Sequence, residues 1–587
     1  MKRRVMGFVA FGAAATLLLS ACGGDDGTGG GGGSGASFDQ GSTEVVNPSD
    51  ATGGTLRYAI SANMESTDPG NTYYGYVWNF SRYYARTLLT YSPVPGEESS
   101  ELVADLAADL PEVSDDGTEW TVRLKEGLRY EDGTEIVAED IKYAIARSNF
   151  GDQALPNGPK YFQQLLDADD YEGPYGRDGD PLEGFDAVET PDDHTLVFHL
   201  KEPFADFPYV LGQPQTAPVP AEADRGEQYQ TRVVSSGPYR FEDDYTPGDG
   251  LVLVRNEEWD AESDPVRTAL PDRITVEEGV DQNEIDQRLV NGELDVDLAG
   301  TGLGPAMKGQ LVSDEDARDN LDNPTTGAHF YIAVNTKVEP LDDLACRQAI
   351  QYAVGREGIQ RAYGGELGGD IATQVLPPGI PGADSSLDPY EAASGEASLD
   401  KAQEKLEECG HPDGFDVNIG VRSDRPAEVD AVEAVQQSLA EAGIRAEIKG
   451  FPSDTFTNTQ AGSPDFVAEN ELGLNYYGWM ADWPSGYGYM SSILDGDAIK
   501  DAGNSNISEL DDPEVNALFD EVVRVEDPEE QAEIYAEIDR LVMENAAILP
   551  GVFQKSVLYR PDNLTNVYFN PSWHMYDYMT LGTTDTE

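Results

Sequence analysis

The sequence is poor in cysteine, histidine and basic residues. Its 587 residues include 3 Cys and 5 His, too few for a scaffold built on disulfides or a metal centre built from many histidines. Lys and Arg number 38 against 110 Asp and Glu, which gives a formal net charge of −72. This balance argues against a nucleic-acid partner, because a phosphate backbone must be neutralised by a basic surface. No spacing of histidines predicts a metal site, and we expect no cofactor.

Long apolar runs are also scarce, and the one present lies at the N-terminus. Three basic residues at 2–4 precede the 15-residue run at 5–19, which is shorter than the roughly 20 residues of a membrane span. The run ends in Leu-Ser-Ala-Cys at 19–22, which resembles a bacterial lipobox, where the cysteine is lipidated. We therefore predict a lipoprotein signal peptide at 1–21 and a lipid anchor on Cys22. The alternative is an ordinary secretory signal with a chance cysteine.

A flexible tether is expected after Cys22. Nine of the 13 residues at 23–35 are glycine, a composition typical of a random coil, and we extend the predicted tether to residue 52. The anchor and tether predict an extracytoplasmic protein on the outer face of the cell membrane. Cys346 and Cys409 then remain as an even pair, which is either a disulfide or two buried thiols.

The body of the chain reads as alternating strands and helices, the pattern of an α/β fold. Expected strands lie at 53–60, 119–124, 194–200, 251–255, 274–276, 329–335, 415–421, 444–448 and 548–554. Expected helices lie at 138–148, 282–291, 342–363, 397–409, 427–442, 513–525 and 528–545. The segment at 415–448 reads as a strand-helix-strand unit.

Four sequence blocks, in order, resemble one known family. The first is Trp-Thr-Val-Arg-Leu-Lys-Glu-Gly-Leu-Arg-Tyr at 120–130, continuing to Arg147. The others are Ser-Gly-Pro-Tyr-Arg-Phe at 236–241, Asn-Thr at 335–336 with the helix at 347–356, and Gly-Trp-Met-Ala-Asp-Trp-Pro at 478–484. Together they resemble the extracellular solute-binding proteins of family 5, which serve peptide/nickel ABC importers. The family usually has Phe-Ser-Asp-Gly where this chain has Tyr-Glu-Asp-Gly at 130–133.

The resemblance implies a two-lobed, periplasmic-binding-protein-like fold of the large class, which closes on a ligand. The first lobe would span residues 53–318 and include an inserted subdomain at about 94–215. The second lobe would span residues 319–540, and residues 541–587 would return to the first lobe. Crossing the hinge more than once lets two rigid bodies rotate while the cleft stays aligned.

Asp482 is the first candidate ligand residue. In peptide-binding members of the family, the aspartate of the Gly-Trp-x-x-Asp block pairs with the peptide α-ammonium, and a dry cleft strengthens such a charge-assisted hydrogen bond. Trp479 and Trp483 flank it and could pack on ligand side chains or a cation. The alternative is a helix-capping aspartate with tryptophans in the core.

Other candidates rest on looser matches. Arg422 and Arg425 follow the predicted strand at 415–421, near where a family dipeptide binder holds the ligand carboxylate; either could instead be a solvated loop arginine. Aromatic residues fall where the first lobe contributes to the cleft and near the hinge: Tyr73, Tyr74, Tyr76, Trp78 and Tyr239. The alternative for these is packing in the core.

The resemblance predicts a monomeric binding protein that captures oligopeptides and delivers them to ABC permease subunits in the membrane. The chain has no Gly-x-x-x-x-Gly-Lys-Ser/Thr loop, so it is not the motor of the importer. It also lacks Gly-x-Ser-x-Gly and His-Glu-x-x-His, so we do not expect a hydrolase. The alternatives are an oligosaccharide, opine or metal chelate as cargo, and a surface peptide sensor.

Overall fold

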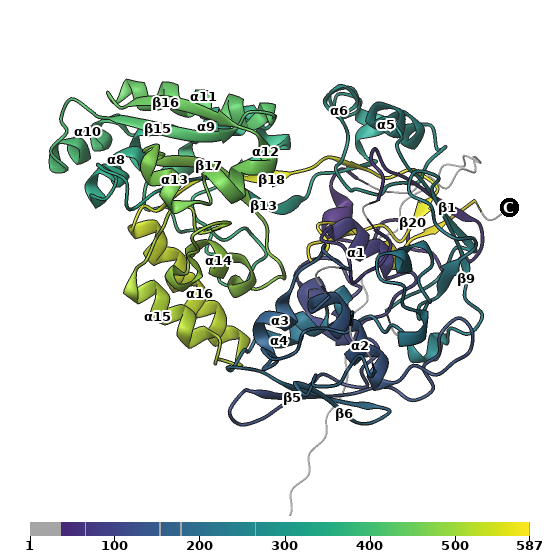
Figure 1. The fold of residues 1–587 in the computed structure, drawn as a ribbon. Helices are drawn as coiled ribbons and strands as arrows, with labels where there is room; N and C mark the ends of the chain where they lie inside the picture. The colour runs from purple at the N-terminus through teal and green to yellow at the C-terminus, as the bar shows by residue number, and fades with distance from the viewer. Residues whose placement is uncertain (1–36, 65, 152–153, 177–178, 265, 586–587) are drawn as a thin grey trace, which may run out of the picture. The chain divides into compact units, whose positions relative to one another are not determined.

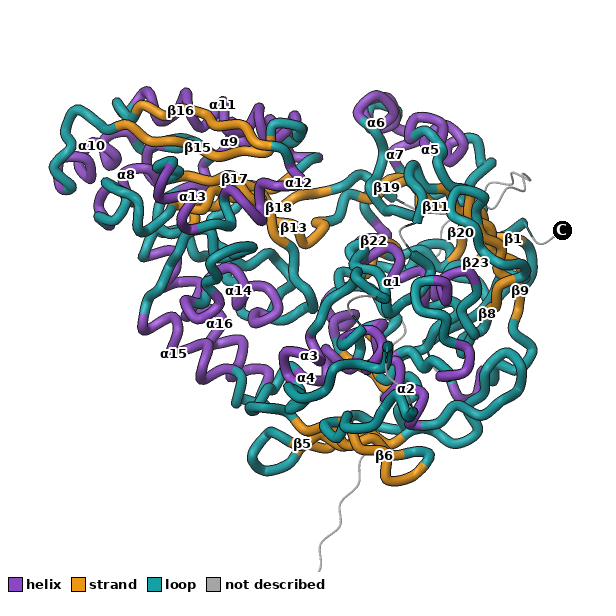
Figure 2. The backbone as a smooth tube through the Cα atoms, in the orientation of Figure 1, coloured by secondary structure: helices purple, strands orange, loops and turns teal. Residues whose placement is uncertain are grey.

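Two large mixed sheets, one in each lobe, organise the described part of the chain (Figures 1 and 2). The computed structural model describes residues 37–64, 66–151, 154–176, 179–264 and 266–585. Helices and strands alternate through these residues, which confirms the predicted α/β class. The predicted signal peptide, Cys22 and the Gly-rich stretch lie outside the described residues.

The first lobe is built on a five-stranded sheet. Its order is β11 (Val296–Asp297), β1 (Thr55–Ala59), β10 (Arg273–Glu277), β9 (Leu251–Arg255) and β8 (Tyr239–Phe241). Strand β1 pairs in parallel with both β10 and β11. Its period-2 pattern buries Leu56 and Tyr58 in a core that also contains Leu564, Phe569 and Tyr578 from the C-terminal segment. The end of the chain therefore completes the first lobe.

A second, smaller sheet forms the inserted subdomain of the first lobe. Its four strands are β4 (Glu112–Val113), β5 (Glu119–Arg123), β7 (Thr195–His199) and β6 (Val188–Asp192). Three helices belong to the subdomain: α2 (Ala138–Asn149), α3 (Tyr161–Leu165) and α4 (Phe207–Leu211). Ile141 and Ile145, four residues apart on α2, are fully buried in its core.

The second lobe contains a six-stranded sheet covered on both faces. Its order is β14 (Gly369–Ile371), β18 (Ile548–Lys555), β13 (Thr325–Val334), β17 (Leu474–Trp479), β15 (Asp416–Arg422) and β16 (Arg445–Phe451). Along β13, Ile332 and Val334 belong to one hydrophobic core, and Tyr331 and Ala333 to another. Because successive side chains point to opposite faces, a strand that is apolar throughout must be covered on both sides.

Helices supply the two covers. One face packs on α8 (Leu344–Ala353), α9 (Arg356–Ala362), α10 (Leu399–Glu408) and α11 (Pro426–Glu441). The other packs on α14 (Gly486–Leu494), α15 (Pro513–Val522) and α16 (Pro528–Glu544). Strands β15 and β16 run parallel around α11, which is the predicted strand-helix-strand unit.

The helix predicted at 342–363 is wrong, because the structure breaks it into α8 and α9. Val354 and Gly355 both have extended backbone between the two helices. The guanidinium of Arg356 is buried and donates hydrogen bonds to the carbonyl oxygens of Gln351, at 2.6 Å, and Val354. The break exposes these carbonyls, and they satisfy a cation that is out of contact with water.

Two predicted boundaries also shift. Strand β18 belongs to the second sheet, so the return to the first lobe begins after Lys555 and not at residue 541. The predicted tether is too long, because residues 37–52 pack on the body. The backbone of Val46 pairs with Val567, and the Gly41 amide donates to the buried carboxylate of Asp322 at 2.8 Å.

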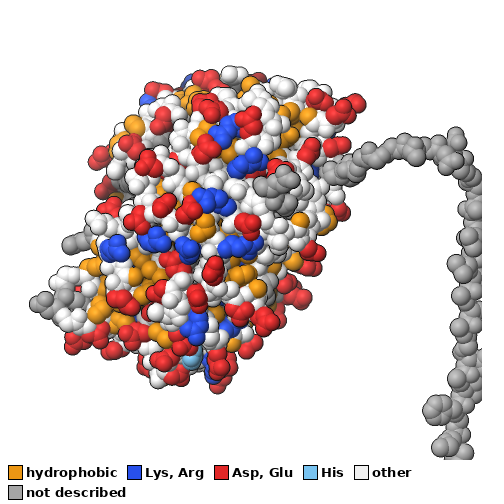
Figure 3. Space-filling model, turned by 90° about the vertical axis from the view of Figure 1, so that its right-hand side faces the viewer, with side chains coloured by type: hydrophobic (Ala, Val, Ile, Leu, Met, Phe, Trp, Pro, Cys, Tyr) orange, Lys and Arg blue, Asp and Glu red, His pale blue; other side chains and the backbone are white. Residues whose placement is uncertain are grey.

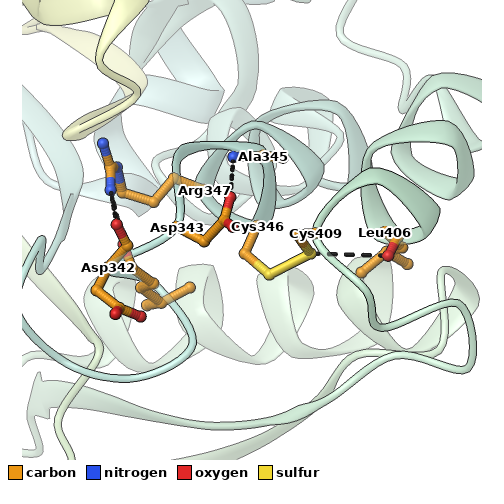
Figure 4. The surroundings of a disulfide bond; sticks show 8 residues. Asp342, Asp343, Ala345, Cys346, Arg347, Leu406 and Cys409 are labelled. Carbon is orange, nitrogen blue, oxygen red and sulfur yellow. Dashed lines mark hydrogen bonds between the residues drawn. A yellow bond between two sulfur atoms is a disulfide. The ribbon is translucent and has the colours of Figure 1, made fainter.

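Cys346 on α8 and Cys409 at the end of α10 form a disulfide, with 5.4 Å between their Cα atoms (Figure 4). Of the two readings that the sequence leaves open, the structure has the bridge. It joins two helices that pack side by side on the same face of the second sheet. The bridge closes a sequence separation of 63 residues and therefore restricts the unfolded chain.

The acid excess is visible on the surface. Acidic side chains are spread over the face in Figure 3, and the Lys and Arg side chains on that face lie among them. Within the described residues, no helix has both the length and the apolar character that crossing a membrane requires.

Candidate ligand-binding site

A cavity of about 570 Å³ lies between the two lobes. The first lobe contributes Tyr73, Gly75, Trp78, Tyr91 and residues 212–213 to its lining, and the C-terminal return contributes residues 572–574. The second lobe contributes Ala328, Phe330, Arg422, Arg425, Glu428, Thr457, residues 477–482 and Gln554. The volume of the cavity is within the range of about 300–1,000 Å³ that is typical of small-ligand sites. Its aromatic lining residues are Tyr73, Trp78, Tyr91, Phe330, Tyr477, Trp479 and Trp573.

Asp482 lies in this cavity just beyond the end of β17. It does not cap the following helix, because the N-cap of α14 is Ser485, whose hydroxyl accepts a hydrogen bond from the Gly488 amide at 2.9 Å. The half-buried Asp482 carboxylate instead accepts a hydrogen bond from the hydroxyl of Tyr73, across the gap between the lobes. The capping alternative is therefore wrong, and the carboxylate faces the space that a ligand would fill.

The electrostatic state of Asp482 follows from its surroundings. Removal from water raises its pKa above the ordinary value, and the hydrogen bonds of Tyr73 and Tyr161 offset this only in part. Among the described residues, no Lys or Arg forms an ion pair with it. A carboxylate without a cation in a partly dry cavity favours binding of a cationic group.

Trp483 is not in the cavity, although it is the neighbour of Asp482. It is 7% exposed, and its indole nitrogen donates to Oδ2 of Asp206 in the inserted subdomain at 2.7 Å. Its ring packs edge-on against Tyr161 and Phe204, with centroid separations of 5.3 and 6.2 Å. The structure therefore places Trp483 in the core of the opposite lobe, and not in the predicted ligand-contacting position.

The aromatic candidates divide between cavity and core. Tyr73 and Trp78 line the cavity, and their rings lie 5.6 Å apart. Tyr74 is 50% exposed and packs on Tyr76, outside the cavity lining. Tyr239 is fully buried and donates its hydroxyl hydrogen to the Pro271 carbonyl at 2.6 Å, so it belongs to the first-lobe core and not to the site.

The two candidate arginines also differ. Arg422 is bound through two hydrogen bonds by Glu428, a buried carboxylate on α11, and one of these is 2.8 Å long. Burial opposes its charge, but the attraction of Glu428 outweighs burial and raises the pKa of Arg422. Arg425 lines the same cavity, is exposed, and among the described residues forms no ion pair; its Nε lies 3.3 Å from Ser453 Oγ. The guanidinium of Arg422 is therefore paired with a carboxylate, whereas that of Arg425 has no ion-pair partner among the described residues.

Three polar atoms of residues that line the cavity, Gln213 Oε1, Trp479 Nε1 and Trp573 Nε1, are buried and have no hydrogen-bond partner among the described residues. Trp479 is a predicted candidate, whereas sequence reasoning missed Gln213 and Trp573. Gln213 also donates weakly to the Asp482 carbonyl at 3.4 Å. Gln213 and Trp573 lie in segments without a family block, so no local pattern marks them; their position depends on long-range packing. A ligand with both donors and acceptors could satisfy these atoms.

A family model and curated relatives both match this chain over most of its length. Residues 101–501 match the family model described as bacterial extracellular solute-binding proteins, family 5 Middle. The glutathione-binding protein GsiB of Salmonella paratyphi A is 24% identical over 526 residues, covering 87% of this chain and 91% of the relative. The same-named protein of Escherichia coli K12 is 25% identical over 524 residues, with the same coverage.

Solved structures show the same architecture. The clavulanic acid biosynthesis oligopeptide binding protein 2 is 41% identical, with a TM-score of 0.89, and the match covers 94% of this chain and 99% of that chain. DppA from Helicobacter pylori, solved in complex with the peptide STSA, is 20% identical with a TM-score of 0.65. That match covers 91% of this chain and 99% of that chain, and it supports the fold alone.

Proposed function

The chain belongs to the family 5 bacterial extracellular solute-binding proteins, and from this membership and its cavity we propose that it captures oligopeptides between its lobes and presents them to a membrane permease. The observation that carries the peptide assignment is the Asp482 carboxylate, which faces the cavity and has no cation partner among the described residues. One relative is named a glutathione-binding protein and another an oligopeptide binding protein, and these names support peptides as the class of cargo.

The charges around the cavity suit a zwitterionic ligand. Arg422 and Glu428 neutralise one another, so Asp482 and Arg425 remain as the charges that a ligand could pair with. A peptide α-ammonium would bind Asp482, and a peptide carboxylate would bind Arg425. The aromatic residues that line the cavity would pack against ligand side chains of different shapes, so they suit peptides of varied sequence.

Binding would act by selecting the closed arrangement of the lobes. A ligand favours closure only by the difference in its contacts between the open and closed states. In this structure Tyr73 of the first lobe already donates to Asp482 of the second. A ligand ammonium would replace or share this hydroxyl and so bind both lobes at once.

The cellular arrangement is part of the proposal. Lipidation at Cys22 would attach the protein to the outer face of the cell membrane, where a monomer would deliver cargo to permease subunits that have their own ATPases. Deletion of the gene should then abolish peptide uptake. A surface sensor would leave uptake intact.

The decisive test is a comparison of peptides with free and acetylated N-termini. Isothermal titration of residues 38–587 with Ala-Phe-Ala and its N-acetyl form should show weaker binding of the acetylated peptide, by about 10-fold or more, because a charge-assisted hydrogen bond is worth about 1.5–3 kcal/mol. The Asp482→Asn variant should bind both forms equally. The matched control Asp465→Asn, at an exposed position on α13 (Pro464–Glu469), should behave like the parent.

Native mass spectrometry of the gently purified protein provides an independent readout. Release of a ladder of short peptides supports the proposal. Release of a single sugar or chelate mass, together with equal binding of free and acetylated peptides, would overturn the peptide assignment.

A further inference from the structure

A second cavity, of about 360 Å³, shares a lining residue with the ligand cavity. Its lining includes residues from the N-terminal segment, from β13 and β18, and from both lobes: Asp39, Thr325, Gly327, Ile380, Lys555 and His574. His574 lines both cavities. Along β13 the lining passes from the second cavity at Gly327 to the first at Ala328, and along β18 it passes from Lys555 to Gln554. The two spaces are therefore neighbours along the same pair of strands.

Because both linings share His574, the partition between the two cavities lies at this residue. The imidazole of His574 packs on Gly327, where a Cβ would lie only 2.4 Å from its Cε1 and 2.6 Å from its Nδ1. Gly327 also has a φ of 73°, a conformation that favours glycine. Because Gly327 has no side chain, the imidazole ring of His574 has room to pack against it.

In the part of the chain that the structure describes, packing contacts alone hold this ring in place. Among the described residues, no hydrogen bond or ion pair to the His574 side chain is present. Burial lowers the pKa of His574 to about 4, so the ring is uncharged at neutral pH. Moving it aside would break no hydrogen bond or ion pair to a described residue, so an incoming chain would have to replace only its packing contacts.

Strand β13 offers an extended path past the partition. Strand β17 pairs with β13 only from His329 to Val334, so residues 325–328 lie beyond the end of that ladder. These residues run from the second cavity into the first. An extended peptide can be held by main-chain hydrogen bonds at such a strand segment, without selection for side chains.

We propose that the second cavity continues the peptide site, so that peptides too long for the first cavity displace His574 and extend along residues 325–328 into it. This inference rests on the proposed function and deepens it: the cargo class becomes longer oligopeptides as well as the short ones that the first cavity alone would hold. The first cavity has a volume of about 570 Å³ and the second a volume of about 360 Å³.

The test is a length series measured on the protein and on a blocked variant. Ala-Phe-Ala is extended with alanine, at the N-terminus in one series and at the C-terminus in the other, from about three to about eight residues, each adding about 3.3 Å. Ile380→Trp fills the second cavity from a partly buried position outside the first. Leu344→Trp, on the exposed surface of α8 and in the lining of neither cavity, is the matched control.

We expect affinity in one series to rise at least about 10-fold beyond the length that fills the first cavity, which corresponds to about 1.4 kcal/mol. Ile380→Trp should remove this gain and leave the affinity for Ala-Phe-Ala unchanged, whereas Leu344→Trp should keep the gain. His574→Ala should strengthen binding of the long peptides relative to Ala-Phe-Ala, because no ring needs to move.

Three outcomes would overturn the inference. Affinity could be flat or falling with length in both series, or the gain could persist in Ile380→Trp; either result refutes the second cavity while short-peptide binding still supports the proposed function. If no peptide of any length binds, the proposed function fails and the inference fails with it. Thermal unfolding of each variant, compared with the parent, shows whether it is folded.

Discussion

Asp482 and Asp206 are both carboxylates at the junction of the lobes, and their surroundings are opposite. Asp206 is 3% exposed and accepts hydrogen bonds from the Trp483 indole and the Ser485 hydroxyl of the other lobe. Asp482 is half-buried, faces a 570 Å³ cavity and accepts hydrogen bonds from the hydroxyls of Tyr73 and Tyr161, both of the first lobe. Burial raises the pKa of both.

The difference separates a contact that joins the lobes from the carboxylate that we propose recognises cargo. The groups around Asp206 are satisfied by protein, so a ligand adds nothing there. Asp482 lacks a cation partner among the described residues, so a ligand that supplies one gains differential binding energy. In this proposal the two roles belong to adjacent residues, because Trp483, which contacts Asp206, directly follows Asp482.

Truncation of Trp483 should have the largest effect on this comparison. Trp483→Ala removes a buried ring from the core of the inserted subdomain, and we expect a loss of about 3–5 kcal/mol in the free energy of unfolding. Small-angle scattering should show a larger radius of gyration, because the contact between Trp483 and Asp206 joins the lobes. Chemical denaturation gives the energy.

The control for that variant is Trp479→Ala, which truncates a partly buried ring that lines the cavity. It should cost less stability and leave the radius of gyration unchanged, while weakening peptide binding. Equal losses of stability in the two variants would contradict the division between holding and recognition.

Replacing each carboxylate with an amide should mainly weaken binding in one variant and mainly lower stability in the other. Asp482→Asn should weaken binding of a free peptide by about 1.5–3 kcal/mol and leave stability equal or higher, because a charged group in a partly dry site is removed. Asp206→Asn should lower stability by about 1–3 kcal/mol, because an acceptor of two buried donors is altered, and should change affinity less. Titration calorimetry measures the affinity of both variants, and denaturation measures their free energy of unfolding. Similar changes of affinity and stability in the two variants would contradict this prediction.

Acidification should weaken binding and stabilise the empty site. The ammonium contact needs the charged form of Asp482, and its pKa is raised by burial, so affinity should fall as pH drops through that raised pKa, earlier than for an ordinary Asp. A raised pKa in the folded state means that its contribution to stability is present at low pH and is lost as pH rises through it. A C-terminally amidated peptide, titrated from about pH 4 to pH 8, isolates the effect. A slope that persists in Asp482→Asn would assign it to another group.

The sequence allowed the fold and part of the site to be predicted. Strands such as β1 and β15 and helices such as α2 carry their own periodicity, so local pattern was enough for them. Asp482 could be placed because it lies in a family block. Trp483 lies in the same block, but its partner Asp206 is 277 residues away, and no local signal links them.

Elsewhere, tertiary contacts overrode local propensity. The pattern at 342–363 favours one helix, yet the buried Arg356 draws on carbonyls that a break exposes. Residues 37–52 follow a Gly-rich run and resemble a tether, yet the Gly41 amide meets the buried Asp322. In each case a buried polar group, invisible in the pattern, determines the conformation.

The smallest expected effect distinguishes the two cavity arginines. Arg425 is exposed, so its attraction to a peptide carboxylate is screened by water, and Arg425→Gln should cost about 0.5–1 kcal/mol of affinity for a free-acid peptide and nothing for its amide. Arg422→Gln leaves the buried carboxylate of Glu428 without its cation, so it should lower the free energy of unfolding by more than it lowers affinity. Calorimetry with paired acid and amide peptides, together with denaturation of both variants, separates these outcomes. Loss of acid-over-amide preference in Arg422→Gln alone would show that the ligand competes with Glu428 for Arg422, and that the ion pair opens when cargo enters.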